Sequence, residues 1–201
     1  MYPFNYKKGH KIQTDAPGFA AKQSFLARIA LSSVQAVAAA VAGILPAVTD
    51  SGAQQVITTG FTNPAYPRNV TATAGGTATD IKAIQVIVEG TNFADEAIAE
   101  TLPAFTVDTA GTVTGNKAFK TITKVTIPAH DGTGATTSIG FGTKLGLPYK
   151  LAHNTIQDAY RNNVREGTAP TVVTSATAIE ANTVTLNSAL NGTPVDLYLF
   201  V

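Results

Sequence analysis

The sequence predicts a mainly β fold: a β-sandwich or barrel of short antiparallel strands, preceded by an extended amino-terminal arm and one long Ala-rich helix. From Ala53 onward, short runs rich in Thr, Val and Ile alternate with turns that contain Gly or Asn. Before that region, apolar residues recur at three- and four-residue steps. At the start of the chain, aromatic residues alternate with other types. We therefore expect an arm over 1–17, a helix over 18–46 and a β domain over 53–201.

The predicted arm carries Tyr2, Phe4 and Tyr6 at alternate positions, followed by Lys7 and Lys8. Alternate residues of an extended strand project to one side. Three aromatic side chains on a free arm would be poorly solvated, so we expect these five residues to contact this domain or a neighbouring subunit. Aromatic and basic residues can also stack on single-stranded nucleic acid. The net charge of only +1 argues against nucleic acid as a partner.

The predicted helix rests on apolar and small residues spaced three or four apart, with stop signals at Gly43 and Pro46. The spaced residues are Leu26, Ile29, Ser33, Val37, Val41 and Ile44. Two uses remain open for such a helix: oligomerisation, or packing on its own sheet. The apolar stretch 29–48 contains Ser, Gln and Pro and lies far from the first residue, so we expect neither a membrane span nor a signal peptide.

The β region contains several runs with strand character. We expect strands at 68–74, 81–89, 97–102, 117–127, 136–141, 182–187 and 195–201. The run 97–102 could also form a short helix, but its surroundings favour a strand. The last two runs are expected to form a hairpin. In its final strand, which should be buried, Val195, Leu197, Leu199 and Val201 should line one face and Tyr198 and Phe200 the other.

The stretch IGFGTKLGLPYKL, at 139–151, raises the possibility of a phosphate-binding loop. Lys144 follows Thr rather than Gly, and no Ser or Thr follows it, so the P-loop pattern is absent. Gly140 and Gly142 share one face of a strand, which would let another element approach closely. We therefore interpret Gly140, Gly142, Gly146 and Pro148 as a structural turn at the end of a close-packed strand.

The sequence contains no catalytic constellation and indicates that the protein is not an enzyme. The absence of cysteine excludes disulfides, thiolate zinc sites and cysteine nucleophiles. His10, His130 and His153 lack a second ligand at zinc-site spacing. The acidic residues Glu96 and Glu100 lack the tryptophan-rich cleft expected of a glycosidase. We expect no catalytic residue, no cofactor and no metal, and hence a structural or binding role.

Charge is scarce and unevenly distributed. Charged residues make up 13% of the chain, about half the usual share. Residues 1–30 carry five basic residues and one acidic residue, whereas 31–115 carry two basic and seven acidic residues. This asymmetry suits head-to-tail contact between copies of the chain, although chance and a solvated surface explain it equally well.

The run from Val86 to Ala129 resembles a pattern found in β-rich virion proteins of tailed bacteriophages. The matching residues are Gly90-Thr91-Asn92, Glu100-Thr101 and Gly115-Asn116-Lys117-Ala118-Phe119-Lys120. The likeness continues through SIGFGTKLGLPYKL to the ending TVTLNSALNGTPVDLYLFV. It covers roughly Ala53 to Val201 and is looser over the helix and the arm.

The resemblance is nearest to capsid (head) decoration, or cement, proteins. It implies a β-sandwich or barrel, a homo-oligomer such as a trimer, and a position on the outer capsid surface after synthesis in the host cytoplasm. The major capsid protein or another virion protein would be the partner, and no catalytic residue is carried over. Two alternatives remain: a tail, neck or baseplate component, and a host-surface or carbohydrate-binding module.

Overall fold

A computed structural model describes residues 11–13, 20–22 and 24–201. These residues form sixteen β-strands and two 3₁₀ helices, η1 (Ala78–Asp80) and η2 (Ile179–Ala181). Every recorded strand pair is antiparallel. The prediction of a mainly β chain is confirmed.

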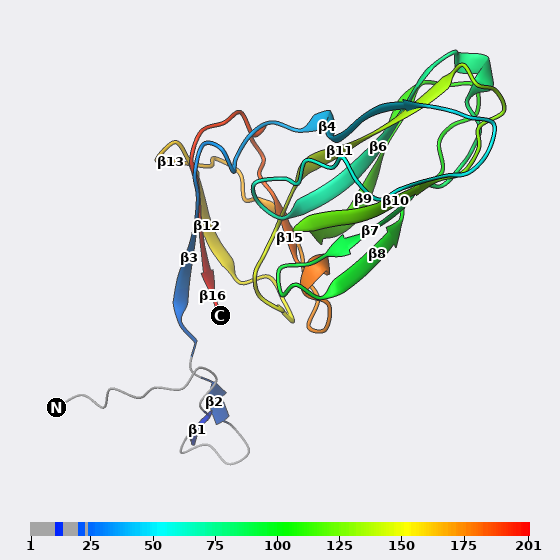
Figure 1. The fold of residues 1–201 in the computed structure, drawn as a ribbon. Helices are drawn as coiled ribbons and strands as arrows, with labels where there is room; N and C mark the ends of the chain where they lie inside the picture. Colours follow the sequence, from blue (N-terminus) through cyan, green and yellow to red (C-terminus); the bar gives the residue numbers. More distant parts are fainter. Residues whose placement is uncertain (1–10, 14–19, 23) are drawn as a thin grey trace.

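Two sheets with a shared core form the larger part of the molecule (Figure 1). The first has the order β14-β15-β11-β6-β9, and β4 pairs with the first half of β11. The second has the order β5-β10-β7-β8. In the first sheet the bounds are β4 (Ala40–Thr49), β6 (Arg68–Gly76), β9 (Gly111–Phe119), β11 (Ala135–Gly146), β14 (Thr171–Val173) and β15 (Thr183–Thr185). In the second they are β5 (Gln55–Ile57), β7 (Ile87–Thr91), β8 (Ala97–Thr101) and β10 (Thr121–Ile127).

Side chains that point alternately to the core and away from it explain why these segments are strands. In β6, Val70, Ala72 and Ala74 are fully buried and face the core, while Thr71 and Thr73 point to the other side. The same core takes side chains from β4, β7, β10 and β11. Burial of one face of each sheet against the other gives the sandwich expected from the sequence.

A smaller sheet stands beside the sandwich (Figure 1). Its order is β13-β12-β16-β3, with bounds β3 (Leu26–Leu31), β12 (Ile156–Arg161), β13 (Val164–Arg165) and β16 (Val195–Phe200). Its inner face belongs to a second hydrophobic cluster that also includes Leu145 of β11 and Val184 of β15. Val195, Leu197 and Leu199 are completely buried, so their predicted common face is confirmed. The second cluster joins the small sheet to the sandwich.

The predicted long helix is wrong, because the described part of 18–46 contains no α-helix. Its described residues form β2 (Ala20–Lys22), β3, a turn, and the first part of β4. β3 pairs with β16 through partners such as Leu26 and Phe200, and β4 pairs with β11 through Ala40 and Phe141. The Ser32 N–H donates to Gln35 Oε1 at 3.0 Å, which fixes the turn between the two strands. Residues 26–49 are therefore parts of the sheets rather than a separate element.

Other strand boundaries also differ from the prediction. The expected strand 81–89 begins only at Ile87, and the expected strand 117–127 is divided between β9 and β10, which belong to different sheets. The expected hairpin at the carboxyl end is wrong: β15 pairs with β11 and β14, whereas β16 pairs with β12 and β3. The run 97–102 does form a strand, β8.

In the amino-terminal segment, β1 (Lys11–Gln13) and β2 (Ala20–Lys22) form a two-stranded antiparallel sheet. This sheet lies beyond the start of β3 (Figure 1). The five predicted contact residues of the arm, Tyr2, Phe4, Tyr6, Lys7 and Lys8, lie outside the described residues.

Candidate assembly surface

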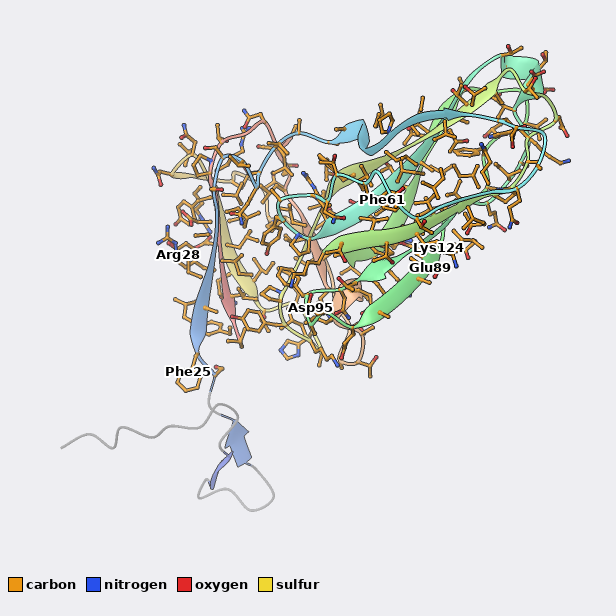
Figure 2. The ribbon with its side chains drawn as sticks, viewed as in Figure 1. Phe25, Arg28, Phe61, Glu89, Asp95 and Lys124 are labelled. Atoms are coloured by element: carbon orange, nitrogen blue, oxygen red, sulfur yellow. The ribbon has the colours of Figure 1, made fainter. Side chains whose placement is uncertain are left out.

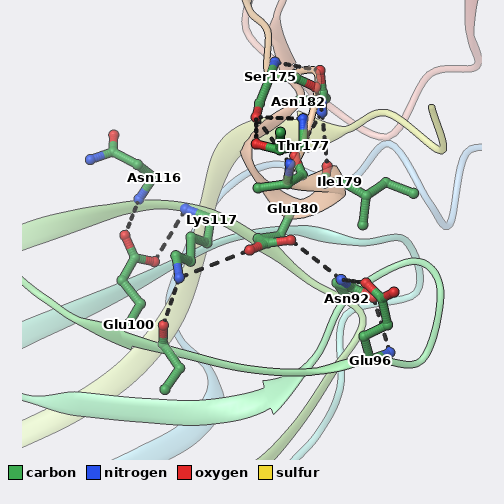
Figure 3. Close-up of polar contacts among 12 residues, drawn as sticks. Asn92, Glu96, Glu100, Asn116, Lys117, Ser175, Thr177, Ile179, Glu180 and Asn182 are labelled. Carbon is green, nitrogen blue, oxygen red and sulfur yellow. Dashed lines mark hydrogen bonds and ion pairs between the residues drawn. The ribbon is translucent and has the colours of Figure 1, made fainter. Parts of the chain in front are cut away.

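Four of the residues that carry the resemblance to phage proteins, Asn92, Glu100, Asn116 and Lys117, take part in one polar network (Figure 3). The Glu100 carboxylate accepts the Asn116 N–H at 2.7 Å and the Lys117 N–H at 3.2 Å. A Cβ atom at Gly115 would lie 2.7 Å from Glu100 Oε2, so a larger residue there would displace the Glu100 carboxylate. The Lys117 ammonium donates to the Ala99 carbonyl at 2.9 Å. These contacts connect β8 to β9 and leave the Glu100 carboxylate engaged within the fold.

Asn92 organises the turn between β7 and β8. Its Oδ1 accepts the N–H groups of Ala94 and Glu96 at 2.9 and 3.1 Å. Its Nδ2 donates to the carboxylates of Glu96 at 2.9 Å and Glu180 at 3.3 Å (Figure 3). Asn92 is only 1% exposed, and buried amides need such complete pairing. The Gly-Thr-Asn part of the motif is therefore a structural turn.

Asn182 has the same function in the loop before β15. Its Oδ1 accepts the N–H groups of Leu151 and Ser175 at 3.2 and 2.8 Å. Its Nδ2 donates to the carbonyls of Ser175 and Ala178 at 2.9 and 2.8 Å (Figure 3). This fully buried amide holds the loop that carries Glu180 against the sandwich.

The glycine stretch lies mostly within β11, which continues through Gly146 before the corner at Pro148. A Cβ atom at Gly140 would overlap the Ala40 carbonyl oxygen of β4, and one at Gly142 would lie 2.6 Å from the Asn69 side chain. At Gly146 it would lie 2.7 Å from the Ala118 Cβ. Because these glycines have no side chains, β4 and the side chains of Asn69 and Ala118 pack directly against the backbone of β11.

Lys144, the only basic residue of that stretch within β11, is also engaged. Its N–H donates to Asn69 Oδ1 at 2.9 Å, and its ammonium donates to Asn116 Oδ1 at 2.5 Å. The Tyr66 hydroxyl donates to the Gly146 carbonyl at 3.0 Å, and burial raises the pKa of the Tyr66 phenol. This stretch is a packed strand rather than an anion-binding loop.

His130 is buried at the end of the sandwich, close to Asp50. The Lys82 N–H donates to Nδ1 at 3.2 Å, so the proton of the neutral ring lies on Nε2, which donates to Thr137 Oγ1 at 3.0 Å. Asp50 accepts the backbone N–H of His130 at 3.0 Å. Burial lowers the pKa of His130, although the negative charges of Asp50 and Asp131 oppose the shift. The neutral imidazole of His130 thus links the backbone at Lys82 to the Thr137 side chain of β11.

Arg68 is the largest fully buried side chain. Its Nη1 donates to the Val37 carbonyl at 3.1 Å, and its guanidinium carbon lies 4.7 Å from the centre of the Phe141 ring. Within the described residues, Nε and Nη2 have no hydrogen-bond partner. Burial lowers the pKa of Arg68 to about 10. The guanidinium connects the turn after β3 to the centre of the first sheet.

Exposed charges on the second sheet are paired with one another (Figure 2). The Lys124 ammonium lies 2.6 Å from Glu89, and the Lys120 ammonium lies 2.7 Å from Asp95. Exposed pairs of this kind contribute at most about 1 kcal/mol each. Their main effect is to leave this surface nearly neutral.

The part of the chain that the structure describes contains no group of three or more His, Cys, Asp or Glu side chains placed to hold a metal ion. In the same part, no helix has the length and apolar character needed to cross a membrane.

The outer face of the small sheet carries a groove of about 610 Å³. Its walls come from β3, β12 and β16, which place Leu26, Tyr160, Tyr198 and Phe200 on one side of the sheet. The rings of Tyr160 and Tyr198 meet edge to face, with centroids 5.8 Å apart. Leu26 is 59% exposed and Phe200 is 41% exposed, so apolar surface remains open to solvent. We call this feature the outer groove.

A second groove of about 600 Å³ lies on the other side of Phe200, lined by residues that include Ser24, Tyr149 and Val201. Phe25, at the start of β3, is 37% exposed (Figure 2). Apolar surface therefore gathers where the amino-terminal segment enters the small sheet. Exposed apolar patches of this kind mark interaction sites in soluble proteins.

Comparison with known proteins gives no match: no protein-family model, no curated protein and no solved structure is similar to this chain.

The sequence-predicted site residues thus divide into two groups. Gly140, Gly142, Gly146 and Pro148 lie in and just after β11, while the predicted arm contacts lie outside the described residues. The outer groove was missed, because its residues come from three strands, and β3 lies more than a hundred positions before β12 and β16. The exposed alternate positions Tyr198 and Phe200 of the last strand were the only signal in the sequence.

Proposed function

We propose that this protein is a non-enzymatic structural protein of a tailed-phage virion, and that it binds the outside of the head shell as a decoration protein. One observation carries the proposal: the outer groove and Phe25 expose apolar surface where the chain after β2 enters the small sheet. A protein that stabilises a shell needs contact surfaces rather than reactive groups. Many weak contacts in a symmetric lattice add up through avidity.

The engagement of the motif residues supports the same proposal. Glu100, Asn92 and Lys144 have the side-chain chemistry of reactive or binding groups, yet each is held by neighbours within the fold. The exposed charges of the second sheet are largely neutralised in pairs. Such a surface suits contact with a shell better than chemistry on a substrate.

Binding to bare heads tests the proposal. Purified protein should co-sediment with heads that lack it and should reach a fixed ratio at saturation. A variant without residues 1–17 should keep its melting temperature and lose most of this binding. Undiminished binding by the truncated variant would count against the role of the arm, and no binding by the full-length protein would count against the decoration role.

A carbohydrate-binding module is the second candidate. The outer groove favours it in one respect, because Tyr160 and Tyr198 lie beside the carboxylates and amides of Asp158, Asn163 and Gln157. Against it, the two rings meet edge to face rather than forming a flat platform. A glycan array with no binding would dismiss this candidate.

A further inference from the structure

We infer that the outer groove binds residues 1–10 of a second copy of this chain. The inference rests on the proposed structural role, in which copies of the protein contact one another, and it adds the receptor surface for the arm. It joins the groove on the small sheet to the aromatic and basic residues that precede β1.

The groove suits alternating aromatic side chains. Leu26, Phe200 and the edge-to-face pair of tyrosines provide its apolar walls. Tyr2, Phe4 and Tyr6 would project to one side of an extended arm. Aromatic anchors in apolar pockets supply much of the binding energy at protein interfaces.

Both carboxylates of the groove are paired with arginines at its rim. Asp158 and Asp196 line the groove, and no basic residue does. Their partners reach in from the rim: Arg165 pairs with Asp158 at 2.5 Å, and Arg28 pairs with Asp196 at 2.9 Å. The two arginine side chains are 67% and 57% exposed. Residues 1–10 carry two lysines and no acidic residue. Because the groove carboxylates are already paired, the aromatic side chains of the arm rather than its charges would supply the binding energy.

The route of the chain favours a neighbouring molecule. β1 and β2 lie beyond the start of β3, away from the small sheet (Figure 1). The ten residues before β1 can span at most about 36 Å when extended. Residues 1–10 are therefore attached at β1, which lies beyond the end of the small sheet (Figure 1). A hairpin of two three-residue strands is marginal by itself and gains from contact with a partner.

A complementation experiment tests the inference with the full chain and two variants. The first variant lacks residues 1–10 and keeps the groove. The second is the double variant Leu26→Ser and Phe200→Ser, which keeps the arm and changes only exposed side chains. Val164→Ser is the matched control, because Val164 is 68% exposed on the same sheet and does not line the groove. Mass in solution is measured by light scattering over a range of concentrations, and melting temperatures confirm folding.

The full-length protein and Val164→Ser should self-associate equally, while each of the two variants should self-associate at least about tenfold more weakly. A mixture of the two variants should form pairs, because one supplies the arm and the other supplies the groove. Self-association of either variant at full strength would overturn the inference. So would a monomeric full-length protein, which would place the arm on its own molecule. Head binding is read separately, so self-association without head binding would contradict only the decoration role.

Discussion

At the scale of single residues, Gly140 shows how closely β4 and β11 approach. A Cβ atom at this position would overlap the backbone of Ala40, which cannot move without breaking the pairing of β4 with β11. We expect Gly140→Val to destabilise the protein by about 1–3 kcal/mol or more, as overpacking does in cores. Denaturant unfolding measures the loss. Gly111→Val is the control, since Gly111 starts β9 with open space around its Cα; equal stability of the two variants would contradict the close approach.

His130 should make stability depend on pH. Its pKa is lowered in the folded state by burial, so the unfolded chain binds the proton more tightly. The stabilisation is complete above the ordinary histidine pKa of about 6.5 and is lost as the pH falls toward the lowered folded value. The slope should reach at most about 1.4 kcal/mol per pH unit. Unfolding free energies from pH 7.5 to 5 measure it.

His130→Gln should reduce this slope, and His153→Gln, at an exposed position, is the control substitution. A slope that survives His130→Gln unchanged would assign the pH dependence to other groups.

At the scale of elements, the helix prediction was wrong because the segment 26–33 fits both the helical spacing of three to four residues and the strand spacing of two. Leu26, Ile29 and Ser33 have helical spacing, but the buried residues of β3 are Ile29 and Leu31, which alternate as in a strand. Ala and Leu at the exposed positions hide this alternation. The deciding partners, Phe200 for Leu26 and Phe141 for Ala40, lie about a hundred or more residues away. A local window of sequence cannot detect them.

The sequence of a segment was sufficient to predict a strand where its β-forming residues or its alternation of apolar side chains were distinct. β6 and β8 match their predicted runs closely, and Val195, Leu197 and Leu199 of β16 share a face as predicted. Gly140 and Gly142 both lie in β11, two positions apart. The outer groove and the Glu100 network depend on contacts between distant strands, so residue types alone did not indicate them.

The carboxyl-terminal strand β16 is central in the small sheet, between β12 and β3. Deleting residues 197–201 removes Leu197 and Leu199, both fully buried, and leaves two strands without their partner. We expect the truncated protein to unfold, measured as loss of the cooperative thermal transition. Phe200→Ser, in the same strand but exposed, should remain folded. A truncation with the wild-type melting temperature would contradict the central position of β16.

At the scale of the whole molecule, buried polar side chains hold the fold together, and one group of exposed apolar residues lies at the start of the small sheet. Asn92, Asn182 and Glu100 hold loops and strands together, and the second sheet carries paired charges. The outer groove and Phe25 are exposed beside the amino-terminal segment. This distribution suits a protein that works by contact with other copies and with a larger assembly.

The location of the protein on the virion tests the central claim most directly. Particles labelled with gold-conjugated antibody against this chain can be imaged in negative stain. The decoration role predicts gold over the head shell and none along the tail. Gold confined to the tail, neck or baseplate, or particles without label, would contradict it.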